Sequence, residues 1–261
     1  MNQTDRELWI NKFNSHMREA RRLSYPVRER SLIALGGQTL ESFLDDLNSK
    51  RLESRASGSS DDANFYLSLV HYVLSLCELL SMWDSLGAHL AEDAWDFLVG
   101  SQEHARAAMR AHGQCRESAI SHLEYLQALE SILFPPQQFV SASFVVMSSD
   151  CSICGKPFHE CDHVSGIAYH GQFCSEIIRE AASIDHIALV DDPHDKRCRT
   201  THFVDDGRRI NSFTLAHEPN EEEAQDRTAE MILMTSSAQK QFTWHRSSVK
   251  VGDEATPKPS D

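Results

Sequence analysis

The sequence lacks an excess of positive charge. Its 25 lysines and arginines stand against 39 aspartates and glutamates, which gives a formal net charge of −14. Because a surface of this sign repels the phosphate backbone, open and non-specific binding to nucleic acid is disfavoured as the main activity. The composition, with 41% hydrophobic and 25% charged residues, is that of an ordinary globular protein. A length of 261 residues predicts one large domain or two small ones.

The sequence also lacks the features of a secreted or membrane protein. Its first residues, Met-Asn-Gln-Thr-Asp-Arg-Glu, contain neither the basic nor the apolar region of a secretory leader. The seven cysteines are an odd number, so we expect a reduced, cytoplasmic protein without membrane contact. The most apolar window, residues 64–83, contains His71 and Glu78. A charged carboxylate inside a bilayer costs about 2.5 kcal/mol or more, so this window is predicted to be a buried helix.

Common catalytic motifs are missing as well. The chain has no Gly-x-Ser-x-Gly nucleophile turn, no phosphate-binding Gly-x4-Gly-Lys-Ser/Thr and no His-Glu-x2-His. The acidic pairs Asp45-Asp46 and Asp191-Asp192 are sequence neighbours that point in different directions, and they are expected in solvent. No catalytic residue and no organic cofactor are therefore predicted.

Residues 1–135 are predicted to form an antiparallel helical bundle. Apolar side chains recur there at helical spacing in six segments: 5–24, 27–35, 39–47, 62–87, 91–112 and 117–133. Gly36-Gly37 predicts a helix end between the second and third of these segments. An antiparallel bundle is the simplest arrangement that buries all of the apolar stripes together.

The character of the sequence changes after Pro135-Pro136. Strands are predicted at four places, of which the second and third are expected to be neighbours: 139–147, 184–190, 198–204 and 210–215. Residues 136–215 are therefore predicted to form a small β-rich module. Residues 216–261 are predicted to be an acidic and partly disordered tail. The predicted fold class is α+β.

A cluster of cysteines lies between residues 151 and 174. Cys151-x2-Cys154 followed by Gly155-Lys156 is typical of a zinc knuckle, in which two thiolates lie on a tight turn and glycine takes a positive φ. Such a spacing is much more specific than a single cysteine or histidine. It predicts one structural zinc ion with Cys151 and Cys154 among its ligands.

Three further residues compete for the two remaining positions of a tetrahedral zinc site. Cys161 and His163 are two residues apart and point to the same side of an extended chain, which favours this pair. Cys174 follows a predicted hairpin turn at His170-Gly171 and is the competing ligand. The other thiols are interpreted as structural: Cys77 and Cys115 as small core or surface thiols of the helical half, and Cys198 as part of the sheet behind the zinc.

The full pattern combines Cys151-x2-Cys154-Gly155 with Cys161-x-His163-x2-Gly166-x2-Tyr169-x-Gly171-x2-Cys174. With the later Leu189-Val190-x2-Pro193 and Cys198-Arg199 segments, it resembles an uncharacterised group of bacterial and mobile-element proteins that have a C-terminal zinc-binding module. The resemblance covers about residues 130–204. It implies a metal site and a prokaryotic setting, and no established activity is attached to the group.

Two nuclease hypotheses are the alternatives to a purely structural zinc ion. Asp162-His163 beside the knuckle is similar to the opening of an HNH motif, in which the histidine activates water. The rest of that motif is missing, because the next asparagine is Asn211 and no second Cys-x2-Cys follows. The Arg-x4-6-His signature of HEPN ribonucleases occurs at Arg106–His112 and Arg116–His122, but this short spacing appears about as often as chance predicts. The sequence therefore favours a non-enzymatic interaction or adaptor protein with a protein partner.

Overall fold

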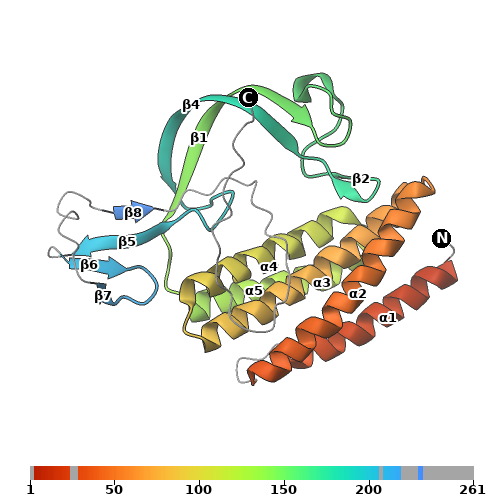
Figure 1. The fold of residues 1–261 in the computed structure, drawn as a ribbon, viewed down its shortest axis with the longest axis horizontal. Coiled ribbons are helices and arrows are strands. Elements are labelled where there is room, and N and C mark those ends of the chain that lie inside the picture. Colours follow the sequence, from red (N-terminus) through yellow and green to blue (C-terminus); the bar gives the residue numbers. More distant parts are fainter. Residues whose placement is uncertain (1–2, 24–28, 206–207, 219–228, 232–261) are drawn as a thin grey trace, which may run out of the picture.

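A computed structural model of the chain describes residues 3–23, 29–205, 208–218 and 229–231. Within these ranges, α-helices in the first half are followed by small antiparallel sheets, so the α+β class is confirmed. The helices are α1 (Gln3–Leu23), α2 (Arg30–Ala56), α3 (Ser60–Gly87), α4 (Ala91–Ala111) and α5 (Arg116–Leu133), with a short 3-10 turn, η1 (Gly113–Cys115), before α5. Successive helices reverse direction along the bundle (Figure 1). The predicted tail lies almost entirely outside the described residues.

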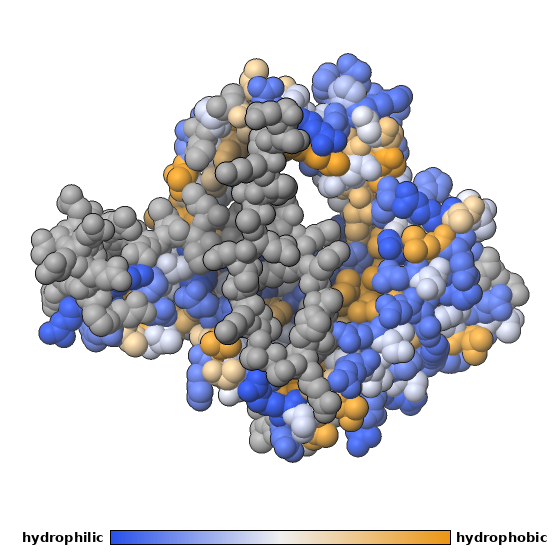
Figure 2. Space-filling model, viewed as in Figure 1, coloured by the Kyte–Doolittle hydropathy of each residue, from blue (hydrophilic) through white to orange (hydrophobic). Residues whose placement is uncertain are grey.

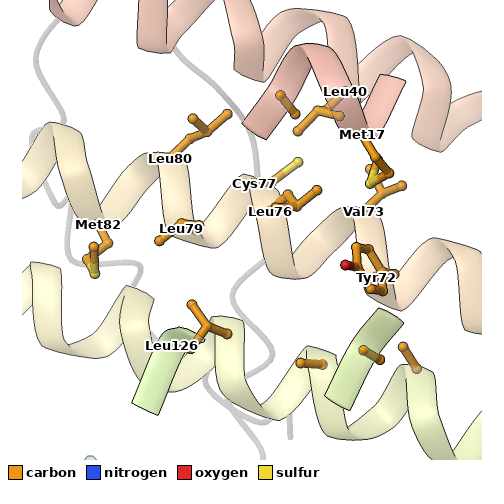
Figure 3. Close-up of a cluster of buried hydrophobic side chains, with 14 of the residues drawn as sticks. Met17, Leu40, Tyr72, Val73, Leu76, Cys77, Leu79, Leu80, Met82 and Leu126 are labelled. Carbon is orange, nitrogen blue, oxygen red and sulfur yellow. The ribbon is translucent and has the colours of Figure 1, made fainter. Parts of the chain in front are cut away.

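Helix α3 forms the centre of the bundle. It is long and apolar enough to cross a membrane, but 83% of its apolar window is buried, as in the core helix of a soluble protein. Figure 3 shows its side chains between α1 and α2 on one side and α4 with parts of α5 on the other, with Val73 near Met17 and Leu40. Leu76, Leu80 and Met82 are almost fully buried. The prediction of a buried helix here is therefore confirmed.

The predicted helix end at Gly36-Gly37 is wrong. Both glycines are buried inside α2, which continues without interruption to Ala56. Ile33 and Leu40, which lie on either side of the glycines, are both buried in the core. Because these flanking side chains gain free energy by burial, tertiary packing outweighs the low helix propensity of glycine. The two predicted segments 27–35 and 39–47 therefore belong mainly to one long helix.

A two-stranded antiparallel ribbon rises from the bundle and arches over it (Figure 1). It consists of β1 (Phe139–Cys151) and β4 (Glu176–Val190), which are both longer than the strands predicted from the sequence. Three residues of β4 (Arg179, Ala182, Asp185) and one of β1 (Met147) have no partner on the opposite strand. Extra residues of this kind bend and twist a strand. They account for the arch, whereas the antiparallel pairing itself places the end of β1 beside the start of β4, with Cys151 opposite Glu176.

The ribbon exposes apolar side chains to solvent. Phe144, Val145 and Val146 on β1 are each about 40% exposed, and Met147 is 63% exposed. Figure 2 shows apolar side chains along the arch, above the helices. An isolated pair of strands is only marginally stable in water. The ribbon therefore depends on what holds its two ends, namely the bundle at one end and the cysteine cluster at the other.

Besides a short hairpin of β2 (Ala168–Tyr169) and β3 (Gln172–Phe173), the described residues contain a separate four-stranded sheet in the order β7-β6-β5-β8. Its strands are β5 (Thr200–Asp205), β6 (Arg208–Asn211), β7 (His217–Glu218) and β8 (Ala229–Met231). The expectation that segment 198–204 pairs with segment 184–190 is wrong. Strand β4 pairs with β1, whereas β5 pairs with β6 and β8. Strands β5 and β6 follow each other closely in the chain, and short connections favour pairing of successive antiparallel strands.

Trp95 joins the helices to the strands. Its ring packs against Phe134, Phe139 and Phe213, with centroid distances of 5.3, 6.2 and 5.5 Å. Its indole N–H donates a hydrogen bond of 3.0 Å to the carbonyl of Lys196. The side chain is only 1% exposed, so a single aromatic cluster holds the base of the ribbon and the small sheet against α4.

Candidate metal centre

The first two candidate ligands lie on a tight turn at the end of β1. Gly155 has a φ of +69°, the conformation that the sequence predicts for the glycine of a zinc knuckle. Its N–H donates to the carbonyl of Cys151 at 2.8 Å, and the N–H of Ile153 points to the Cys151 sulfur at 3.4 Å. A backbone N–H group therefore stabilises negative charge on this sulfur independently of a metal ion.

Cys161 and His163 approach the same point from the other side. They follow a short 3-10 turn, η2 (Phe158–Glu160), in an extended connection rather than a strand. One ligand atom from each of Cys151, Cys154, Cys161 and His163 lies within 4.8 Å of all the others. These four residues can therefore hold a metal ion, as the favoured set from the sequence predicts.

Cys174 lies beside this group as well. Its sulfur is 3.7 Å from that of Cys151, and the residue is 2% exposed. Two thiolates on one tetrahedral zinc ion are about 3.8 Å apart when each Zn–S bond is about 2.3 Å long. The predicted hairpin with its turn at His170-Gly171 is present and returns Cys174 beside Cys151, but Cys174 is not among the four ligand atoms that all lie within 4.8 Å of one another.

His163 differs from Cys174 in its hydrogen bonding. The edge of the His163 ring contacts Tyr169, with centroids 4.7 Å apart. Its Nδ1 atom is buried and has no hydrogen-bond partner within the described residues. A buried polar atom without a partner costs free energy, and a coordinated cation would remove that cost. The Cys174 thiol already has the Cys151 sulfur as a partner.

The thiols of the cluster titrate differently. Burial opposes ionisation of Cys151, but the N–H groups of Cys154 and Ile153 and the neighbouring thiols outweigh it and lower the Cys151 pKa to about 6. Burial and the adjacent Cys151 raise the pKa of Cys174 to about 11. Burial likewise raises the pKa of Cys161. One thiolate therefore forms readily, and a divalent cation is what would allow several to coexist.

A short hairpin connects the cluster to the bundle. It consists of β2 (Ala168–Tyr169) and β3 (Gln172–Phe173) and lies between His163 and Cys174 in the chain. Asn64 of α3 accepts a 2.8 Å hydrogen bond from the N–H of Gly171 and donates to the carbonyl of Ala168 at 3.2 Å. Arg51 of α2 donates to the carbonyl of Gly171 at 2.7 Å. Neither side chain was predictable from the sequence, because nothing in their local pattern marks them.

Gly171 is the tightest point of this contact, and its substitution should loosen the hairpin. Its φ is +76°, and an added Cβ would lie 3.0 Å from the Cβ of Ala63 and 3.2 Å from the Ala63 carbonyl oxygen. We expect Gly171→Ala to lower the free energy of unfolding by about 1–3 kcal/mol. Urea unfolding followed by circular dichroism measures this. Gly58→Ala is the control, because Gly58 also has a positive φ, +78°, but no atom lies within 4 Å of its added Cβ. Equal losses in the two variants would contradict the tight contact at Gly171.

The other residues that the sequence singled out lie outside the cluster. Of the core and surface positions that the sequence left open for Cys77 and Cys115, the structure shows the core, since both are buried in the bundle. His170 is exposed, and the side chain of His159 is 79% exposed. Cys198 is half-buried near the base of the ribbon, where its carbonyl accepts a hydrogen bond from the N–H of Val140.

The residues of the two nuclease hypotheses do not converge. Asn211 lies on β6, where its side-chain Oδ1 accepts hydrogen bonds from the N–H groups of Phe213 and Thr214. The ring of His122 is 4% exposed and is hydrogen-bonded to Ser75, whereas Arg116 is exposed. His112 faces Asp61 at 3.3 Å rather than Arg106. No hydrogen bond or ring contact joins the arginine and the histidine of either pair within the described residues.

Comparison of the chain with protein-family models, with curated proteins and with solved structures found no match.

Proposed function

We propose that the cluster holds one structural zinc ion and that Cys151, Cys154, Cys161 and His163 are its ligands. The observation that carries this proposal is the convergence of these four ligand atoms within 4.8 Å. Three sulfurs and one imidazole are the soft and borderline donors that zinc prefers, whereas magnesium and calcium prefer oxygen ligands. The zinc would contribute folding free energy by closing the loop that contains the hairpin.

We further propose that the protein is a cytoplasmic interaction or adaptor protein that binds a protein partner. A site with four protein ligands leaves no open position for substrate, which favours a structural role. The absence of disulfides among the seven cysteines suits a reducing compartment. The exposed apolar ribbon is a surface of the kind that partners cover. We also propose a role as an accessory component of a bacterial or mobile-element system, which is what the resemblance of the cysteine pattern implies.

The metal content and the absence of cleavage test this proposal together. Protein purified without added metal should contain about one zinc per chain by atomic emission spectroscopy. The same protein should leave single- and double-stranded DNA and RNA intact in the presence of Mg²⁺ or Mn²⁺. A fully folded preparation without zinc would contradict the structural ion. Cleavage that His163→Ala abolishes while the fold and the zinc content persist would contradict the adaptor role and favour a nuclease.

A further inference from the structure

Four arginines gather on one side of the bundle without acidic partners. Arg51 and Arg55 are one helical turn apart on α2, and Arg106 and Arg110 are one turn apart on α4. Helix α3 packs against both helices and carries His71 between the two pairs. No salt bridge involves any of these four arginines in the part of the chain that the structure describes, although acidic residues outnumber basic ones.

The β2–β3 hairpin contacts one arginine of each pair. Arg51 donates to the carbonyl of Gly171, and the Arg110 guanidinium lies 5.6 Å from the ring centroid of Phe173, two residues further along. Phe173 also contacts the His71 ring, at 5.3 Å between centroids. The guanidinium groups of Arg51 and Arg110 therefore flank one short stretch of chain, above His71.

The guanidinium groups of Arg51 and Arg110 are partly desolvated, and each is repelled by the arginine one turn away on its own helix. Burial and the neighbouring Arg55 lower the pKa of Arg51, and burial and Arg106 lower the pKa of Arg110. The Nε atom of Arg51 is buried without a hydrogen-bond partner. Positive charge that is brought together and partly removed from water is costly unless an anion compensates for it.

The other charged and titratable groups near the cluster do not provide this compensation. Glu103 on α4 faces Arg106 and Arg110, but its carboxylate is paired with Arg197 at 2.6 Å. His71 and His104 share a contact of 3.0 Å between their Nδ1 atoms, and burial lowers the pKa of each, so both are neutral near pH 7. The net charge of the cluster is thus positive.

We propose that Arg51, Arg55, Arg106 and Arg110 form a binding site for a compact phosphate-bearing anion. Arginine presents a planar set of donors that matches phosphate oxygens, and two pairs on separate helices suit two phosphate groups. A site of this size is local, so it is compatible with a chain whose overall charge repels long nucleic acids. Because this anion site uses none of the metal ligands, it is independent of the proposed zinc function.

Calorimetric titration with inorganic pyrophosphate tests the site. At constant ionic strength, pyrophosphate should bind with a dissociation constant below about 1 mM, and inorganic phosphate should bind more weakly. Arg110→Gln and Arg55→Gln should each weaken binding by about tenfold. Both side chains are exposed, so the variants should fold. Arg22→Gln on α1, whose side chain is 80% exposed, is the matched control and should bind like the wild type. Zinc content is measured after each titration, because pyrophosphate chelates metals.

Two results would overturn the site. One is a pyrophosphate affinity that Arg110→Gln and Arg55→Gln leave unchanged, or no binding above that of sulfate at the same ionic strength. The other is binding of a ten-nucleotide oligouridine that depends on Arg110 when pyrophosphate does not bind. That result would show that the ligand of the arginine site is a single-stranded nucleic acid rather than a compact anion.

Discussion

Replacing Cys151 with serine is expected to remove the metal and to unfold the small module around it. Cys151 is 1% exposed, ends β1 and lies closest to the backbone donors of the knuckle. Substitution of residues that only support a metal ligand costs 10–100-fold in metal affinity, so loss of this ligand should cost more than about 100-fold. Without the metal, the β2–β3 hairpin and the adjoining end of the ribbon are no longer linked to each other, whereas the helices retain their own hydrophobic core. Helicity at 222 nm should therefore remain close to that of the wild type.

The measurement combines zinc competition with a chromophoric chelator and amide hydrogen exchange. Exchange should become fast in β2, β3 and the adjoining end of β1 but stay slow in α3. Cys77→Ser is a matched control, since Cys77 is equally buried but lies inside the bundle. This control should lower bundle stability while keeping the zinc. Retention of wild-type zinc affinity in Cys151→Ser would contradict the proposed ligand set.

The same assay separates His163 from Cys174. We expect His163→Ala to weaken zinc binding more than Cys174→Ser, because the buried Nδ1 of His163 has no other partner. Cobalt-substituted protein gives an independent reading, since three thiolates and four thiolates differ in the intensity of sulfur-to-metal charge transfer. A four-thiolate spectrum that persists in His163→Ala would assign the fourth position to Cys174 instead.

Regular periodic patterns made the helices predictable from the sequence. The segments 62–87, 91–112 and 117–133 match α3, α4 and α5 closely, because each has a long apolar stripe and a clear end signal. Gly36-Gly37 misled the prediction, since a local end signal says nothing about the tertiary burial of Ile33 and Leu40. Propensity is local, whereas the packing that overrides it is not.

The strands and the connections of the site were less predictable. The residues that bend the ribbon, such as Asp185 and Met147, have no distinctive sequence signature, and strand pairing depends on distant partners. The convergence of the four candidate ligands was predictable because the Cys-x2-Cys-Gly-Lys turn is a local chemical pattern. The residues that hold the hairpin, Arg51 and Asn64, are more than 100 positions away in the chain and ordinary in local context. Their role appears only in three dimensions.

Acidification is expected to destabilise the bundle steeply, and His122 is the clearest cause. Its ring is 4% exposed and is hydrogen-bonded to Ser75. Burial, together with the charge of Arg21, lowers its pKa from 6.5 to about 4. Below pH 6.5 the histidine of the unfolded chain is protonated, whereas the buried histidine of the folded chain stays neutral. The free energy of unfolding therefore decreases as the pH falls from 6.5 toward 4.

His71 and His104 act in the same direction. Burial lowers the pKa of His71 to about 3 and that of His104 to about 4, with the charges of Arg51, Arg110 and Arg197 adding to the shifts. Each such histidine contributes a slope of at most about 1.4 kcal/mol per pH unit. Three of them together give about 4 kcal/mol per pH unit near pH 5. This is a large share of the stability of an ordinary domain.

The variant His122→Gln removes the contribution of one of the three buried histidines to the pH dependence of the unfolding free energy. Glutamine stays neutral at every pH, so between pH 7 and pH 5 the variant should lose about 2 kcal/mol less unfolding free energy than the wild type. Urea unfolding of the zinc-loaded protein at both pH values, followed at 222 nm, gives the two differences. Comparing them cancels any metal release that is common to both proteins. Exposed His186→Gln is the matched control and should reproduce the wild-type difference. If His122→Gln instead loses as much unfolding free energy between pH 7 and pH 5 as the wild type, then His122 is protonated in the folded bundle. In that case burial does not lower its pKa, and the prediction is wrong.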